Sequence, residues 1–231
     1  MLTRYPLRMS DIKIIGINGS PYKDGVVCEL LNAILHAAEK AGADTQTFHL
    51  YDHEIKPTPG LYSKDPKDET PANMPNDDMT KLIYPAVRDA DIIVLATPCY
   101  WANMSGVMKN FIDRLTPMEN DGFGLLGKIA VFIAASKENE GGVEMAAMSM
   151  VAPLTQMGVI VPPGGVLWAP GDWVNAEEAI PSWALHDAPL VGKDMVKLAR
   201  LLKREKFESV SYTHLRAHET KANLVCRLLL E

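Results

Sequence analysis

Cysteine is scarce in this sequence, which has only Cys28, Cys99 and Cys226 among its 231 residues. The three cysteines lie far apart and show none of the paired spacings that are typical of disulfide frameworks or zinc sites. The N-terminal stretch lacks the apolar core of a signal peptide. Together these observations predict a protein of a reducing, cytoplasmic compartment.

Positive charge is also in short supply, because 23 Lys and Arg residues face 29 Asp and Glu residues, for a net charge of −6. Without a basic stripe, nucleic acid and anionic membrane surfaces are excluded as partners. No apolar run approaches the roughly 20 residues that a membrane span needs, so we expect no membrane segment. His49 and His53 are the closest approach to a metal motif, but no carboxylate or cysteine pattern completes a site, and we expect no bound metal.

Strand-like apolar runs alternate with helical patterns along most of the chain. The predicted strands cover residues 12–17, 44–50, 91–98, 128–136 and 159–168. The predicted helices cover residues 28–42, 78–90, 105–118, 141–158 and 190–207. The first, third and fourth strands have continuous instead of alternating apolar character, which indicates burial on both faces. We therefore predict an α/β, flavodoxin-like fold, with a five-stranded parallel sheet and helices on both faces.

One domain is expected, covering residues 10–208. Two segments interrupt its pattern: residues 52–76 contain five prolines, and residues 162–183 contain three tryptophans. The second of these is expected to pack on a partner subunit, over the site, or simply into the core. Residues 209–231 resemble a translated sequencing adapter, and we predict that they lie outside the fold.

The loop after the first strand reads GINGSPYKDGVV and leads into a helix. Backbone N–H groups and the helix dipole at such a turn favour an anion. No Gly-Lys-Ser/Thr follows, so this is not a P-loop, and the glycines lack the G-x-G-x-x-G spacing of a dinucleotide site. The loop is expected to present Ser20 and backbone N–H groups to one phosphate.

The loops after the third and fourth strands lie at the same predicted edge. In the first of these, Pro98 sets the exit from the strand, and Tyr100 and Trp101 offer two ring faces that suit a planar ligand. The alternative is that these aromatics only cap the core. In the other loop, the glycines at 141 and 142 allow a ligand to approach the backbone.

With these three loops in view, residues 12–165 resemble the NADPH-dependent FMN reductase family and, within it, the iron-sulfur flavoproteins. The resemblance rests on GSP at 19–21, DDM at 77–79, P-x-Y-W at 98–101 and K-x-F-I-D-R at 109–114. It implies a flavodoxin-like fold that binds FMN, in a homodimer or homotetramer. The cofactor-binding residues that it implies are Ser20, Tyr22, Lys23, Gly25, Val26, Val27, Pro98, Cys99, Tyr100, Trp101, Ser136, Gly141 and Gly142.

The sequence departs from the family in two places. Tyr22, Gly25, Val26 and Val27 stand where the family commonly has Arg, Ser, Asn and Thr or Ser, which removes a cation and polar side chains from the phosphate site. We expect weaker FMN binding, unless backbone amides and Lys23 compensate. Residues 52–76, where the iron-sulfur flavoproteins carry a compact cysteine motif, contain no cysteine, and we expect no iron-sulfur cluster.

The function that we predict is an FMN-dependent oxidoreductase, which takes hydride from NADPH or NADH and passes electrons to a quinone, a free flavin or another small acceptor. No catalytic side chain is named, because the flavin carries the redox chemistry. Lys137 is a candidate to stabilise charge on reduced flavin, Cys99 is expected to be a packed, inert thiol, and Asp113 and Arg114 are expected to make structural contacts at a helix end. The alternatives are an electron carrier without nicotinamide activity, or a binding module that has lost flavin.

Overall fold

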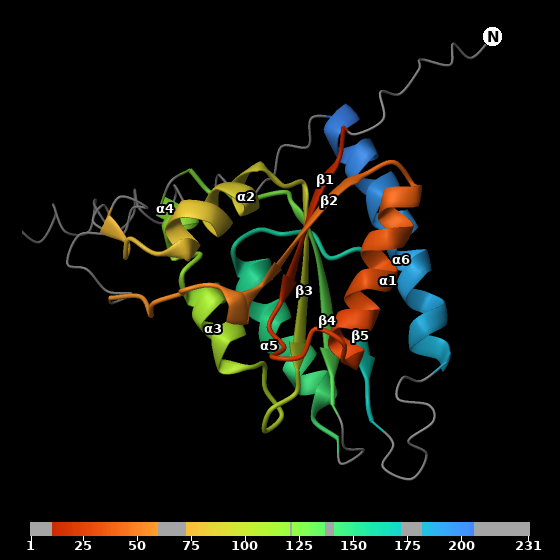
Figure 1. Cartoon of the computed structure of the whole chain (residues 1–231). Helices are drawn as coiled ribbons and strands as arrows, with labels where there is room; N and C mark the ends of the chain where they lie inside the picture. Colours follow the sequence, from red (N-terminus) through yellow and green to blue (C-terminus); the bar gives the residue numbers. More distant parts are fainter. Residues whose placement is uncertain (1–10, 60–72, 121, 137–140, 172–181, 206–231) are drawn as a thin grey trace, which may run out of the picture.

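The computed structural model describes residues 11–59, 73–120, 122–136, 141–171 and 182–205, and in this part the chain forms a parallel sheet of five strands with helices on both faces (Figure 1). The strand order is β2-β1-β3-β4-β5, as in flavodoxin-like folds. The strands are β1 (Lys13–Asn18), β2 (Asp44–His49), β3 (Ile92–Pro98), β4 (Ile129–Ala135) and β5 (Val166–Ala169). The predicted fold class is confirmed. All five carboxyl ends point to the lower edge of the sheet in Figure 1.

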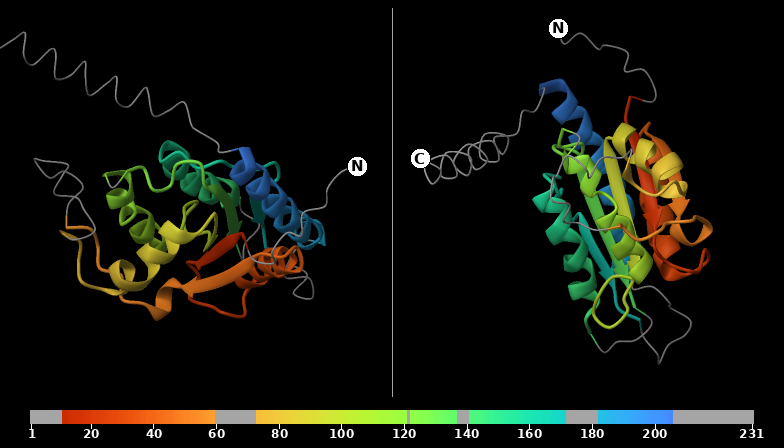
Figure 2. Two further views of the ribbon diagram at one scale, coloured as in Figure 1. Left: turned by 90° about the horizontal axis from the view of Figure 1, so that it is seen from above. Right: turned by 90° about the vertical axis from the view of Figure 1, so that its left-hand side faces the viewer.

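The helices divide into two groups, one on each face of the sheet (Figure 2). Helices α1 (Val26–Lys40) and α6 (Ser182–Glu205) pack side by side on one face. The other face is covered by η4 (Met79–Ile83), α2 (Tyr84–Asp89), α3 (Gly106–Asp113), α4 (Thr116–Asn120) and α5 (Val143–Gln156). A short 3-10 turn, η1 (Leu50–Asp52), follows β2.

The central strands explain this arrangement, because successive side chains point to opposite faces and are buried on both. In β3, Ile92 and Val94 pack toward α1 and α6, whereas Ile93 and Leu95 pack toward α3 and α5. All four side chains have no exposed surface. The central strands are apolar without alternation because helices cover both of their faces.

The predicted boundaries differ from the structure at prolines and glycines. The helix predicted at 78–90 begins as the π-helical turn η4, directly before Pro85, which has no N–H to continue an ordinary helical ladder. The strand predicted at 159–168 is regular only over Val166–Ala169, since prolines and glycines occupy residues 162–165. The last helix begins at Ser182, earlier than predicted, and contains Pro189.

The crossing of α1 and α6 depends on Gly192. A Cβ atom at this position would lie 2.4 Å from the carbonyl oxygen of Ile34, so the two backbones approach too closely for any side chain. Nearby, Trp168 of β5 and Trp183 of α6 make an edge-to-face contact with ring centroids 6.5 Å apart. Two of the three tryptophans in the apolar segment therefore pack on each other.

Some predictions fall on residues that the structure does not describe. They concern residues 60–72 within the proline-rich segment, Trp173, Lys137 and the tail at 209–231. The domain boundary at 208 stays a prediction. Among the described helices, none combines the length and the apolar character that crossing a membrane demands.

Candidate functional site

The three loops singled out in the sequence meet at the carboxyl edge of the sheet. Ser105, at the start of α3, donates its hydroxyl to the carbonyl oxygen of Gly19 at 2.8 Å, which joins the loop after β1 to the segment after β3. The thiol of Cys99 donates to the carbonyl oxygen of Gly142 at 3.4 Å, which joins that segment to the loop after β4. A Cβ atom on Gly142 would lie only 2.8 Å from Cβ of Ala102. The loops form one contiguous surface.

The loop after β1 is held by its own polar groups. The Asn18 side chain is fully buried, and its Oδ1 accepts the backbone N–H of Ser20 at 2.8 Å. Ser20 is buried in turn, and its hydroxyl accepts the N–H of Tyr22 at 3.2 Å. Tyr22 itself is 67% exposed. Asn18 and Ser20 therefore fix the start of the loop, whereas the Tyr22 side chain points into solvent.

Helix α1 begins at this loop without a side-chain cap. Gly25 occupies the N-cap position in an extended conformation, and no side chain bonds to the first turn. The Val27 side chain lies in the core between α1 and the sheet, and Val26 packs against that core. Only the backbone N–H groups of these valines are thus available to an anion, which suits the free positive end of a helix.

The loop after β3 is a tight reverse turn with a strained tip. Tyr100 and Asn103 exchange two backbone hydrogen bonds, of 2.9 and 3.1 Å. Between them, Trp101 and Ala102 have φ values of 53° and 57°, in the left-handed region that residues other than glycine rarely adopt. Two successive left-handed residues are the geometry of a type I′ turn. Backbone strain of this kind concentrates at functional sites.

This turn presents its aromatic rings to the outside. Trp101 is 101% exposed and Tyr100 is 44% exposed, so neither side chain caps the core. In Figure 1 the turn after β3 projects below the sheet. The alternative that these aromatics only complete the core is therefore wrong for Trp101.

The loop after β4 is partly described. Ser136 lies directly after β4, and its N–H donates to the carbonyl oxygen of Ala169 at 3.0 Å. Gly141 and Gly142 have φ values of 86° and 88° and lead into α5. A Cβ atom on Gly141 would meet no atom of the described residues within 4 Å, so no described side chain crowds this glycine.

The end of β2 forms a fourth part of this surface, which the sequence analysis did not include. Asn18 Nδ2 and His49 Nδ1 lie 3.0 Å apart. Lys23 donates to the Asp52 carboxylate at 2.5 Å, so the ammonium expected to help bind a phosphate already has an anionic partner. The available signal was topological, because β2 is the neighbour of β1 and its carboxyl end lies at the same edge.

Burial favours the neutral forms of three titratable groups on this surface, those of Cys99, Tyr100 and His49. It is the largest cause that raises the pKa of the Cys99 thiol, which favours the unreactive thiol over the thiolate. Burial, with the nearby phenols of Tyr51 and Tyr22, also raises the pKa of Tyr100. For His49 burial lowers the pKa, and the charge of Lys23 lowers it further. That Cys99 is an inert thiol stays a prediction, with which this direction agrees.

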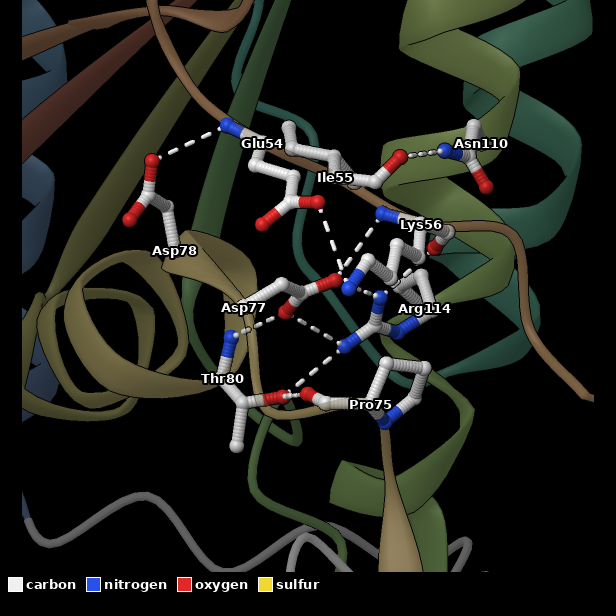
Figure 3. Close-up of polar contacts among 9 residues, drawn as sticks. All are labelled: Glu54, Ile55, Lys56, Pro75, Asp77, Asp78, Thr80, Asn110 and Arg114. Atoms are coloured by element: carbon white, nitrogen blue, oxygen red, sulfur yellow. Dashed lines mark hydrogen bonds and ion pairs between the residues drawn. The ribbon is translucent and has the colours of Figure 1, made fainter.

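A second polar cluster lies between the start of η4 and the end of α3 (Figure 3). Arg114 is 1% exposed and grips Asp77 with both terminal nitrogens, at 2.7 and 3.1 Å. The same guanidinium donates to the carbonyl oxygen of Lys56 at 2.6 Å and to the hydroxyl of Thr80 at 2.8 Å. Arg114 thus makes the structural contacts predicted for it at a helix end. Asp113 pairs with Lys109 at 2.5 Å, closer to the surface.

This cluster fixes both ends of the proline-rich segment. Asp77 accepts the backbone N–H groups of Lys56 and Thr80, and Asn110 of α3 donates to the carbonyl oxygen of Ile55 at 2.7 Å. Burial raises the pKa of Asp77, but the hydrogen bonds from Arg114 and from the two backbone N–H groups outweigh it and bring the pKa to about 2. The role of the cluster is therefore structural.

The described residues outside this surface include two shallow hollows and no cluster of metal ligands. No group of three or more potential metal ligands occurs among the described residues. Two shallow hollows, of about 210 and about 200 Å³, lie at the amino edge of the sheet, away from the loops. Several of their charged groups are paired, as in the contact of 2.8 Å between Lys203 and Asp91 and in the ion pair of Lys13 with Asp89.

Sequence comparison identifies the family of the chain. The family model described as NADPH-dependent FMN reductase matches residues 12–174. An iron-sulfur flavoprotein of Archaeoglobus fulgidus is 33% identical over 140 residues, which is 61% of this chain and 67% of that protein. An iron-sulfur flavoprotein of Methanocaldococcus jannaschii is 27% identical over 203 residues, covering 84% of this chain and all of that protein.

Comparison with solved structures supports the same fold. RosB, solved with the bound intermediate 8-demethyl-8-formylriboflavin-5′-phosphate, superposes with a TM-score of 0.71 at 18% identity, over 91% of this chain and 87% of that chain. An NAD(P)H:quinone oxidoreductase of Methanothermobacter marburgensis superposes with a TM-score of 0.61 at 16% identity, over 80% of this chain and 98% of that chain. At these identities the likeness shows a shared fold.

Proposed function

Because the chain belongs to the NADPH-dependent FMN reductase family, and is on that ground a flavin-dependent oxidoreductase, we propose that it takes hydride from NADPH or NADH and passes electrons to a quinone, a free flavin or another small acceptor. The observation that carries the proposal is the contact of the three loops, through Gly19 with Ser105 and through Ala102 with Gly142. A flat, phosphorylated ligand needs its anion site and its ring site on one continuous surface.

The residues present fit FMN at both ends of that surface. The first turn of α1 has no side-chain cap from Gly25, and the loop that leads into it carries the buried Ser20, which suits a phosphate. The backbone at Gly141, which no described side chain crowds, and the exposed ring of Tyr100 suit a flat ring system. In RosB, the structural neighbour reported above, the bound intermediate is itself a riboflavin phosphate.

Each loop receives its own role in the proposal. Ser20 and the residues from Tyr22 to Val27 hold the phosphate, largely through backbone N–H groups. The ring lies against residues 98–101 on one side and against Ser136, Gly141 and Gly142 on the other. When bound, FMN supplies the hydride and electron chemistry, and the chain binds it, orients it and limits the access of water.

Two features set the strength of binding in this proposal. The polar side chains that the family usually carries at 22 and 25–27 are replaced by Tyr22, Gly25, Val26 and Val27. Lys23 is shared with Asp52 instead of standing free. Both features weaken the grip on a phosphate, so we expect FMN that exchanges with solution instead of FMN that stays bound through purification.

No iron-sulfur cluster enters the proposal. Clusters of the kind held by Cys thiolates commonly take four such ligands, and the sequence has three widely spaced cysteines. We further propose that the protein is cytoplasmic, as its few scattered cysteines suggest. We also propose that it works as a homodimer or homotetramer, as the family resemblance implies.

The test uses the full chain and visible spectroscopy. In equilibrium dialysis against FMN, flavin absorption should be higher on the side of the protein, and anaerobic NADPH should bleach it until a quinone restores it. Riboflavin, which lacks the phosphate, serves as the matched ligand and should be retained less. Bound FMN that NADPH leaves unchanged would favour the electron carrier, and protein that retains no FMN would favour the binding module.

A further inference from the structure

A continuous line of hydrogen bonds runs from the end of β2 into the loop after β1. His49 Nδ1 lies 3.0 Å from Asn18 Nδ2, and Asn18 Oδ1 lies 2.8 Å from the backbone nitrogen of Ser20. The Ser20 hydroxyl then accepts the N–H of Tyr22. His49 and Asn18 are paired across the last register position of β1 and β2, so two strands hold this line at its base.

The direction of these bonds assigns a protonation state to His49. The backbone N–H of Ser20 is a donor, so the Asn18 atom that faces it must be the carbonyl oxygen. The amide nitrogen of Asn18 therefore faces His49, and an amide nitrogen only donates. Nδ1 of His49 must accept this hydrogen bond, which places the ring proton on Nε2 and leaves the imidazole neutral.

We propose that His49 is a positioning residue for the loop after β1. Its neutral imidazole holds Asn18, and Asn18 in turn holds Ser20 in the arrangement that receives the phosphate of FMN. The inference rests on the proposed function, because it concerns the same phosphate site. It adds to that site a histidine that neither approaches a metal nor acts on the substrate.

The surroundings of His49 support a neutral ring at neutral pH. Its pKa is lowered below 6.5, first by burial, then by the charge of Lys23 and to a lesser extent by His53. Asp52 acts in the opposite direction, and it is already paired with Lys23. His53 in turn lies 3.6 Å from the carboxylate of Asp78.

Protonation of His49 has a defined consequence. A second ring proton on Nδ1 would face the amide protons of Asn18, so two donors would meet at 3.0 Å. Asn18 is fully buried and cannot turn its amide without losing the bond to Ser20. Acidification through the pKa of His49 should therefore loosen the loop and weaken the binding of FMN.

Two substitutions separate this role from a merely structural one. His49→Asn keeps an acceptor oxygen near the position of Nδ1 but cannot titrate, whereas His49→Leu keeps bulk and removes the acceptor. Dissociation constants for FMN and riboflavin are measured on the full chain by flavin fluorescence. Loss of one buried hydrogen bond should weaken FMN binding roughly three- to tenfold in His49→Leu, and riboflavin binding less, while His49→Asn stays within about twofold of the wild type.

The pH profile is the second readout. A phosphate monoester itself takes up a proton near pH 6, so the affinity of the wild type for FMN changes with pH for this reason too. Dividing by the dissociation constant of His49→Asn at the same pH removes this common contribution. The ratio of the two FMN dissociation constants, wild type over His49→Asn, should rise at least about threefold as the pH falls from about 7.5 to about 4.5, a range that extends well below the ordinary pKa of histidine. An unchanged ratio, a His49→Asn variant as weak as His49→Leu, or a His49→Leu variant equal to the wild type would overturn the inference.

The inference and the proposed function fail in different ways. If the wild type binds no FMN at any pH, the proposed function fails, and the inference is then decided on cofactor-free protein. Nitrogen chemical shifts of the His49 ring near neutral pH should show the Nε2–H tautomer. A proton on Nδ1 under these conditions would contradict the assigned role.

Discussion

The guanidinium of Arg114 and the carboxylate of Asp77 form a two-pronged, buried ion pair between positions 37 residues apart in the chain. Each residue belongs to a motif on which the family resemblance rests, DDM for Asp77 and K-x-F-I-D-R for Arg114. The structure shows that these two motifs are the two halves of one contact. Through Lys56, this pair holds the start of the proline-rich segment near the end of α3.

Arg114→Leu should destabilise the cofactor-free protein strongly. Removal of one partner leaves the Asp77 carboxylate buried and unpaired, which costs about 3–5 kcal/mol. Urea unfolding measures the difference. Asp113→Ala, which breaks the exposed pair with Lys109 one residue earlier, is the matched control and should cost at most about 1 kcal/mol. Equal losses in the two variants would show that the buried pair has no special weight.

Acid should release the contribution of Asp77. Its pKa of about 2 in the folded state lies below the usual 3.8, so its carboxylate stabilises the fold fully above pH 3.8 and progressively less as the pH falls toward 2. The difference in pKa corresponds to about 2 kcal/mol. In unfolding experiments across this range, the wild type should lose about that much more stability than Asp77→Asn. Parallel pH profiles for the two proteins would contradict the assignment.

Gly192→Ala should destabilise the protein even though alanine favours helices. The new methyl group would lie 2.4 Å from the Ile34 carbonyl oxygen, so α1 and α6 must move apart. Gly106→Ala is the matched control, because Gly106 also lies in a helix but a Cβ there meets nothing within 4 Å. Thermal unfolding of the cofactor-free variants should show a lower Tm for Gly192→Ala and an unchanged or higher Tm for Gly106→Ala.

Gly142→Ala should disturb the junction between the loops after β3 and β4. Gly141 and Gly142 share left-handed backbone, so alanine is strained at both, but only at Gly142 does the added Cβ meet Ala102. The free energy of unfolding should therefore fall by more in Gly142→Ala than in Gly141→Ala. The same loss in both would mean that backbone strain alone, and not the contact between loops, matters here.

Asp52→Asn should tighten the binding of FMN. The substitution frees the Lys23 ammonium and removes a negative charge near the proposed phosphate site. Since exposed ion pairs are worth up to about 1 kcal/mol, the gain should be at most about fivefold and should shrink in high salt. The effect should be seen for FMN and not for riboflavin. Asp194→Asn, which breaks an exposed pair with Lys197 on α6, should leave both affinities unchanged.

The sheet and its helical layers could be predicted because local patterns carry them. Residues 92–96 of β3 are apolar without interruption, and the periodicity of α1 marks the face that it buries. The meeting of the loops after β1, β3 and β4 follows from the parallel sheet, since all strands then end at one edge. The strained turn could not be foreseen, because neither Trp101 nor Ala102 is a residue that favours a positive φ.

The sequence by itself determined the strands, the helices and the edge at which the loops lie, because these depend on periodicity and on backbone preferences that act over a few residues. Only the tertiary structure decided which side chains became partners, as in His49 with Asn18, Lys23 with Asp52 and Arg114 with Asp77. Such contacts need two distant segments to arrive within about 3 Å with matched donors and acceptors. That condition is set by the packing of the whole sheet, and no local pattern records it.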